Sequence, residues 1–301
     1  MDQIKKLIVL VLVVFLFTGF SKNKQDEPTA LKVMTYNIWN GFDWGKDSLR
    51  REQCIQWIKK QQPDVLALQE MCGYDEAKLR KDALKWGHKY VQLLKEDGYP
   101  TALTSNQPII LKEKKTDSLW HGLLHCETYG VDFYVVHLSP ADVSFRHREA
   151  KLITKRIKNG TNDKYIVLGD FNSHSPIDAQ VLEKNLSLKK KYRAAKNKND
   201  YSNLRNGEFD YSVISEFLAC PTKDVALTKV DVLKTGHTFP TSALIGKYSN
   251  TQQSIIQNRQ RIDYILASPI LANSCTTVDI FNQKETHGLS DHYPMMATFG
   301  L

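Results

Sequence analysis

Features that would place this chain among small disulfide-rich, fibrous or disordered proteins are scarce. Its 301 residues include only five cysteines, none of them in a C-x-x-C pair, which disfavours a zinc ribbon or a redox dithiol. The 15 glycines and 10 prolines gather into no linker or repeat. Hydrophobic residues make up 42% of the chain and charged residues 25%, so a sizeable core can form. We therefore expect a globular protein.

The five cysteines are too few and too widely spaced to form a disulfide framework. Their odd number leaves at least one of them unpaired. The favoured interpretation is that they are small buried apolar side chains, and the alternative is one or two disulfides formed in an oxidising compartment. They are Cys54, Cys72, Cys126, Cys220 and Cys275.

No apolar run is long enough for a comfortable membrane span, which needs about 20 residues. The longest run, Leu7 to Phe17, follows Lys5 and Lys6 and precedes a small-x-small pattern at residues 19–21, which predicts a signal peptide over residues 1–21. An uncleaved signal anchor is the alternative. We predict a polar leader over residues 22–30, a folded domain over residues 31–301, and a secreted protein or one of the periplasm or cell surface.

Acidic residues are fewer than basic ones, 33 against 41, which gives a formal net charge of +8. This excess suits a polyanionic substrate or an anionic surface without identifying either. Much of it lies in residues 184–208, where we expect a solvated insertion loop, with a phosphate-tracking patch as the alternative. The basic residues of that segment are Lys189, Lys190, Lys191, Arg193, Lys196 and Lys198.

Hydrophobic periodicity predicts an α/β fold. Strands are expected over residues 31–39, 64–70, 165–171, 261–267 and 292–299, and a hairpin joins residues 122–128 to 131–138 across Tyr129 and Gly130. Cys54, Trp57 and Ile58 have helical spacing, and a second helix is expected from Phe145 to Ile157. Strand-helix-strand units mixed with hairpins indicate a single domain, a two-sheet β-sandwich flanked by helices.

Hydrogen-bonding and ionisable residues stand where these strands end. Together they supply what phosphodiester cleavage needs, which is oxygen ligands for a hard divalent cation, an activated water and a proton donor. The set comprises Asn37, Glu70, His137, Asp170, Asn172, Asp263, Asp291 and His292.

Six short motifs carry these residues in a recognisable order. They are TYNIW (35–39), LQE (68–70), VHL (136–138), LGDFN (168–172), RIDYI (261–265) and SDH (290–292), and smaller echoes are LTS (103–105) and HTFP (237–240). From about residue 31 to the end, the chain resembles the endonuclease/exonuclease/phosphatase superfamily, which has the deoxyribonuclease I-like fold. The implied four-layer α/β sandwich agrees with the periodicity.

The resemblance also implies a role for each residue. Glu70 is expected to bind Mg²⁺ (or Mn²⁺), with Asn37 and Asp291 in the same metal site. Asp170 and Asn172 are expected to orient the attacking water and hold a phosphoryl oxygen. Asp263 is expected to fix the tautomer of His292, and His137 to protonate the leaving oxygen or stabilise its charge. Either Asp170 or His292 is then the general base.

Competing motifs are weaker. His121 and His125 have metal-pair spacing but lie in a strand-like segment without the zincin glutamate. There is no G-x-x-x-x-G-K-[ST] phosphate loop and no G-x-S-x-G elbow. Arg146, His147 and Arg148 are expected to form a solvated first helical turn, with phosphate contacts beside the site as the alternative.

The motifs also bear on the substrate. The residues after Asn172 and around Asp263 depart from the pattern of inositol polyphosphate 5-phosphatases, and residues 100–137 lack the tyrosine motif of apurinic endonucleases. We therefore predict a secreted, metal-dependent phosphodiesterase, with nucleic acid slightly favoured over phospholipid as the substrate and no stable protein partner. The alternatives are a sphingomyelinase-like phospholipid phosphodiesterase and a catalytically silent, surface-displayed binding protein on the same fold.

Overall fold

The computed structural model describes residues 30–194 and 202–301. The predicted signal peptide and nearly all of the predicted leader lie outside these residues, as do Lys196 and Lys198. Ala30, the last residue assigned to the leader, instead opens the first strand. No helix in the described part of the chain has the length and apolar character needed to cross a membrane.

Two six-stranded sheets form the centre of the molecule, with a two-stranded β10-β9 ribbon beside them. The first sheet has the order β13 (Cys275–Ile280), β14 (Met295–Gly300), β1 (Ala30–Asn37), β2 (Val65–Gln69), β4 (Ala102–Ser105), β3 (Tyr90–Leu93). The second has the order β11 (Lys223–Asp224), β12 (Asp263–Ala267), β8 (Tyr165–Asp170), β7 (Val131–His137), β6 (Leu123–Thr128), β5 (Ile110–Lys115). The ribbon joins β9 (Leu204–Arg205) to β10 (Glu208–Phe209).

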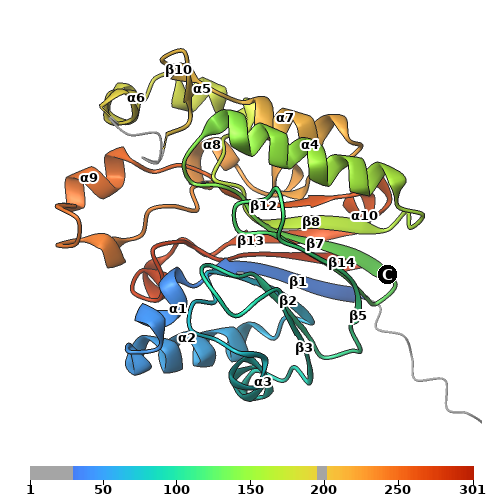
Figure 1. Cartoon of the computed structure of the whole chain (residues 1–301). Helices are drawn as coiled ribbons and strands as arrows, with labels where there is room; N and C mark the ends of the chain where they lie inside the picture. The colour runs from blue at the N-terminus through green and yellow to red at the C-terminus, as the bar shows by residue number, and fades with distance from the viewer. Residues whose placement is uncertain (1–29, 195–201) are drawn as a thin grey trace, which may run out of the picture.

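Helices cover the outer faces of both sheets, so the molecule has four layers (Figure 1). One outer layer contains α2 (Ser48–Gln61) and α3 (Glu76–Lys85), and the other contains α4 (Val143–Asn159) and α7 (Ser212–Ala219). The shorter helices are α1 (Trp39–Trp44), α5 (Ala179–Leu182), α6 (Leu186–Arg193), α8 (Val232–Thr235), α9 (Gln252–Gln257) and α10 (Pro269–Ser274). Single 3-10 turns lie at Pro176–Asp178, Val225–Thr228, Ser242–Leu244 and Lys284–Thr286.

Three apolar clusters fill the spaces between the four layers. The central cluster joins the facing sides of the sheets, with Val33 from one sheet and Phe133 from the other among its members. The second packs the first sheet against α2 and α3, and the third packs the second sheet against α4 and α7. Because both faces of each sheet are covered, the central strands are apolar throughout rather than alternating. The predicted two-sheet sandwich flanked by helices is confirmed.

Local sequence accounts for most element boundaries. Asp47 and Asp142 cap α2 and α4 by accepting hydrogen bonds from backbone N–H groups of the first turn. The predicted hairpin forms between β6 and β7, where Tyr129 and Gly130 both have positive φ, as a two-residue turn of this kind requires. The last predicted strand begins too early, because β14 starts at Met295 and leaves His292 in the preceding loop.

All five cysteines are buried and free, which confirms the apolar interpretation and excludes the disulfide alternative in this structure. Burial raises the pKa of the Cys54 thiol to about 12, so this side chain is an uncharged thiol at neutral pH.

Candidate active site

Strand direction brings the predicted site residues to one rim of the sandwich. The parallel strands β1 and β2 end at Asn37 and just before Glu70, and the parallel strands β7 and β8 end at His137 and Asp170. Strand β12 runs antiparallel to β8 and therefore begins at this rim with Asp263, directly opposite Asp170. His137 lies opposite Asp170 on the other side. Register alone thus sets three site residues side by side.

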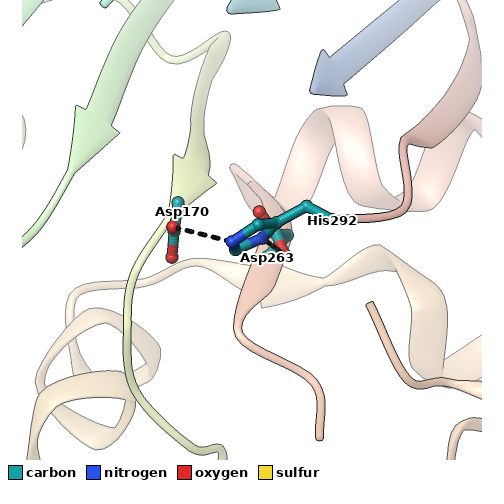
Figure 2. A group of neighbouring side chains, drawn as sticks. All are labelled: Asp170, Asp263 and His292. Carbon is teal, nitrogen blue, oxygen red and sulfur yellow. Dashed lines mark hydrogen bonds and ion pairs between the residues drawn. The ribbon is translucent and has the colours of Figure 1, made fainter. Parts of the chain in front are cut away.

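An aspartate-histidine pair forms the centre of the site (Figure 2). His292 Nδ1 lies 2.9 Å from Asp263 Oδ2, and its Nε2 lies 3.7 Å from Asp170 Oδ2. All three side chains are buried. Burial favours a neutral imidazole, but the charges of Asp263 and Asp170 outweigh it and raise the pKa of His292 well above its ordinary value. His292 is therefore an imidazolium held between two carboxyl groups.

At Asp170, burial has a larger effect on the pKa than the neighbouring charges have. Burial raises the pKa of this carboxyl to about 7, against the effect of the His292 charge, because few solvent contacts stabilise the anion. Oδ2 accepts a hydrogen bond of 3.1 Å from Asn37 Nδ2, and Oδ1 accepts one of 2.9 Å from the backbone N–H of Asn172. These two donors fix the carboxyl plane.

Glu70 is clamped by β1 and the turn that follows it. Asn37 Nδ2 donates to Glu70 Oε1 over 3.1 Å, and the backbone N–H of Asn40 donates to Oε2 over 2.6 Å. Asn40 reaches Glu70 because residues 39–44 all have positive φ and form one left-handed turn, a costly conformation for residues other than glycine. Glu70 itself has a φ of 58°. Strained backbone on both sides therefore sets the direction of one carboxylate.

The donor set around Glu70 fits a divalent cation. Burial and the charge of Glu70 raise the pKa of the Asp291 carboxyl to about 7, although the His292 charge opposes this. Within the described ranges neither Glu70 nor Asp291 forms an ion pair with lysine or arginine. Two carboxyl groups without a lysine or arginine partner suit a hard metal ion that prefers oxygen ligands.

The predicted role of Asn37 as a ligand stays a prediction. In this arrangement its amide nitrogen faces Glu70 and Asp170, and its Oδ1 accepts from the Trp39 N–H over 3.0 Å. Asn37 therefore orients the two carboxyl groups. Among the described residues, Asp170, Asp263 and His292 also have ligand atoms within 4.8 Å of one another. Within this group, His292 Nδ1 and Asp263 Oδ2 are already engaged in a hydrogen bond with each other.

His137 completes the row on β7. Its Nε2 lies 3.6 Å from Asp170 Oδ2, and its Nδ1 is buried without a hydrogen-bond partner in the described part of the chain. The ring stacks on His121 with centroids 4.0 Å apart and planes inclined by 22°. Burial and the nearby His121 and His292 lower the pKa of His137 well below its ordinary value, so it is a neutral imidazole. A neutral ring donates or accepts a hydrogen bond more readily than it releases a proton.

A cavity of about 530 Å³ opens beside these groups. Its lining includes the polar side chains of Asn172, Asp291 and His292 and the apolar ring of Phe239. Lys191 of α6 also lines it, and desolvation lowers the pKa of this ammonium group. A lining with both polar and apolar side chains suits an organic ester whose phosphoryl group reaches the histidine.

The basic segment differs from the loop expected for it. Residues 186–193 form a helix, and Lys189 is buried and bonded to Glu183 and Glu208 at 2.7 Å each. These acidic partners neutralise Lys189, so the segment is not simply a solvated loop. Lys191, two residues further along the same helix, lines the cavity.

Arg146 is also misjudged by the sequence reasoning. The expected solvated turn is wrong for this residue, because Arg146 is 0% exposed and donates to Ser139 O, Ser202 O and Asn203 Oδ1. Ser202 and Asn203 lie 56 and 57 residues further along the sequence, so only the folded chain brings them to Arg146. His121, considered above only for a zinc pair with His125, instead stacks on His137, whereas His125 stacks on Tyr134.

Comparison with known proteins agrees with this geometry. The model of the Endonuclease/Exonuclease/phosphatase family matches residues 34–292. No curated protein is matched at a significant level. An AP endonuclease from Archaeoglobus fulgidus has a similar structure, with a TM-score of 0.67 and 18% identity over 90% of this chain and 100% of that chain.

Two further solved structures are similar over the same shares of each chain, 90% and 100%, again at 18% identity. The 3'-5' exonuclease NExo from Neisseria meningitidis has a TM-score of 0.61, and a 3' phosphatase NExo variant from Neisseria bound to product DNA hairpin has a TM-score of 0.62. At this identity the likeness establishes the fold.

Proposed function

Because the chain belongs to the endonuclease/exonuclease/phosphatase family and is thus a metal-dependent phosphoric ester hydrolase, we propose that it is a secreted, Mg²⁺- or Mn²⁺-dependent phosphodiesterase that cleaves nucleic acid. The observation that carries the reaction type is the Asp263-His292-Asp170 arrangement beside Glu70. The proposal that the protein is secreted rests on Lys5 and Lys6, which precede the apolar run to Phe17.

In this proposal Asp170 takes the proton of the attacking water. His292 is unsuited to that task, because two flanking carboxyl groups keep it protonated. Asp170 has a pKa near neutrality and an Oδ2 that faces both catalytic histidines. A base whose pKa lies close to the working pH is the most effective one. The sequence left the choice between these two residues open, and the charges around them favour Asp170.

His292 then serves as a charged hydrogen-bond donor to the phosphoryl group. Asp263 holds Nδ1, so Nε2 faces the space beside Asp170. The imidazolium stabilises negative charge that develops on a phosphoryl oxygen, an effect that is large in a site shielded from water. His137 lies on the other side of Asp170 and, as a neutral ring, offers a hydrogen bond to the leaving oxygen. Asn172 fixes the Asp170 carboxyl through its backbone N–H.

Glu70 and Asp291 would hold the divalent cation, which when bound supplies positive charge to the phosphate and helps its ester bond to break. Asn37 and the Asn40 N–H orient Glu70 for this purpose. Hydrogen bonds that orient a metal ligand commonly affect metal affinity nearly as strongly as the ligands themselves do.

Nucleic acid is favoured as the substrate by charge and by likeness. The chain has a formal net charge of +8, and Lys191 reaches the cavity next to His292. One similar solved structure is bound to product DNA hairpin, and another is an AP endonuclease. Positive charge strengthens binding to a polyanion at low salt.

Hydrolysis of bis-p-nitrophenyl phosphate tests the reaction type. We expect turnover that EDTA abolishes and Mg²⁺ or Mn²⁺ restores, and that falls by about 10²–10⁴-fold in His292→Ala. His147→Ala is a control, because His147 faces Glu216 of α7 at 3.8 Å and does not line the cavity beside His292. Equal activity in His292→Ala and His147→Ala would refute the assignment of the site. No metal-dependent turnover of any phosphodiester would favour the silent binding protein.

The substrate class is tested separately with plasmid DNA, RNA, sphingomyelin and phosphoinositides at low and moderate salt. Nicking of plasmid that depends on His292 and weakens with salt supports the nuclease. Cleavage of the lipids alone would overturn it. Fractionation of the natural producing cells, with detection of the mature chain outside the cytoplasm, tests secretion.

A further inference from the structure

A continuous row of rings lies beside His137, and its members outside the buried His121 reach towards the surface. It runs Trp44, Tyr99, His121, Trp120, Phe145, and successive ring centroids are 6.0, 5.5, 6.4 and 5.8 Å apart. We call these five residues the aromatic row. They come from α1, from the loops before β4 and β6, and from the first turn of α4, so four separate segments converge to build it.

The outer rings of the aromatic row are open to solvent. Trp44 is 47% exposed, Trp120 44% and Tyr99 37%. Tryptophan and tyrosine have some of the largest side chains in proteins. Most of such a ring is expected to be buried in the protein core unless the ring contacts a ligand or a partner. Their edge-on contacts with one another hold each ring in place. A ligand would therefore meet rings that are already ordered.

The row is connected to the reaction centre through His121. This ring is buried, and it stacks on His137 with a centroid separation of 4.0 Å. Burial lowers the pKa of His121 to about 3, so it is a neutral, flat bridge between the exposed rings and the catalytic imidazole. A substrate held at His137 is thus within reach of Tyr99 and Trp120, which both contact His121.

The surroundings of the row distinguish two kinds of occupant. The segments that carry it, residues 39–45, 94–101, 116–122 and 143–148, expose no large aliphatic side chain, although a surface that inserts into acyl chains usually has several. Two cations lie close to the rings, although the same segments also carry Asp43, Glu96, Asp97 and Asp117, and Lys95 lies 4.0 Å from Asp97. The Arg148 guanidinium lies 5.2 Å over the Phe145 ring, and the charge of Lys95 acts on His121. Stacking rings beside cations are the means by which proteins bind unpaired nucleotides.

We propose that the aromatic row binds the unpaired bases of a single-stranded nucleic acid whose reacting phosphate lies between His137 and His292. The proposal rests on the proposed function and narrows its substrate to strands, or strand ends, with unstacked bases. The rings take the bases without regard to sequence, since every base has a face that can stack. Arg148 and Lys95 would accompany the phosphates.

Binding of a fluorescein-labelled twelve-residue oligo(dT), measured by anisotropy in EDTA so that no cleavage occurs, tests the row. A base-aromatic stack contributes about 1–3 kcal/mol, so Trp120→Ala and Tyr99→Ala should each raise Kd at least about fivefold. Trp120→Phe should retain most of the affinity. Tyr90→Ala is the matched control, because Tyr90 is a comparably exposed ring on β3, outside the row.

Wild-type affinity in both alanine variants would overturn the proposal, as would failure of the wild type to bind the oligonucleotide. Thermal melts followed by circular dichroism show that the variants are folded. In parallel, sedimentation with sphingomyelin-phosphatidylcholine vesicles tests the lipid alternative, and vesicle binding that depends on Trp120 while oligonucleotide binding does not would replace nucleic acid by membrane. A wild type that binds the oligonucleotide but hydrolyses no phosphodiester refutes the proposed function instead.

Discussion

Replacing Gly41 by alanine perturbs the left-handed turn that holds Glu70. Gly41 has a φ of 55°, and a Cβ added there would press into the backbone of Cys72, 2.8 Å from both its nitrogen and its carbonyl carbon, with the carbonyl oxygen closer still. These Cys72 atoms cannot move away easily, because all of them belong to the backbone. Asn40, the residue before Gly41, supplies the N–H that binds Glu70 Oε2. A shift of the turn therefore moves a metal-site hydrogen bond.

The expected loss of stability has two parts. An alanine in the left-handed region costs about 1–2 kcal/mol relative to its preferred conformation. Forced movement of close-packed atoms adds about 1–3 kcal/mol. We therefore expect Gly41→Ala to lower the free energy of unfolding by about 2–5 kcal/mol, and to raise the metal concentration needed for half-maximal activity by about 10–100-fold, as loss of a supporting contact to a ligand does.

Gly130→Ala is the matched control. Gly130 also has a positive φ, of 67°, but nothing lies within 4 Å of an added Cβ. The Gly130→Ala variant should lose only the conformational contribution to the free energy of unfolding, about 1–2 kcal/mol. Its metal requirement should be unchanged. Urea unfolding in EDTA and metal titration of bis-p-nitrophenyl phosphate hydrolysis measure the two quantities. If both variants lost equal stability and had the metal requirement of the wild type, the coupling between the turn and Glu70 would be refuted.

Further predictions concern the charges of the site and of the core. Asp263→Asn should lower kcat by about 10²–10⁴-fold and bring the pKa of His292 down towards its ordinary value, which NMR titration would detect; an unchanged His292 titration contradicts the pairing. Because burial raises the pKa of Asp170 to about 7, kcat/KM should rise with pH up to about that value, as the base loses its proton, and a flat profile through this range would argue against Asp170 as the base. Arg261→Met leaves two buried carboxyl groups without their arginine and should destabilise the fold by about 3–5 kcal/mol; a loss below 1 kcal/mol in urea unfolding would show that the pairs contribute little.

The strands and the order of the site residues along the chain are local properties. Apolar runs ending at Asn37, Glu70, His137 and Asp170 predict strands whose ends carry polar groups, and the structure has strands at those places. The helix over Val143–Asn159 and the β6-β7 hairpin likewise follow from periodicity and from Tyr129-Gly130. Such features depend on residues within a few positions of one another, so the sequence contains their cause.

Residues outside these patterns were judged less well. Arg146 follows a strand and starts a helix, which is typical of an exposed position, yet its three acceptors come from Ser139 and from residues 202 and 203. His121 was considered above only for a disfavoured zinc pair with His125, and in the structure it stacks on His137. The contacts of Arg146 with residues 202 and 203 join segments distant in the chain, which local spacing does not report. The stacking of His121 on His137 depends instead on the register of the β6-β7 hairpin.

The sequence by itself therefore determined which residue types stand at the strand ends, the two-sheet architecture and the family resemblance. The resemblance also implied the pairing of Asp263 with His292, which the structure contains. Only the tertiary structure decided that Glu70 receives the Asn40 N–H from a left-handed turn, and that a row of rings continues from His137 towards the surface. The physical reason is that periodicity reports the environment of each segment, buried or exposed, whereas contacts between segments depend on strand register and on how the two sheets pack, to which every part of the chain contributes.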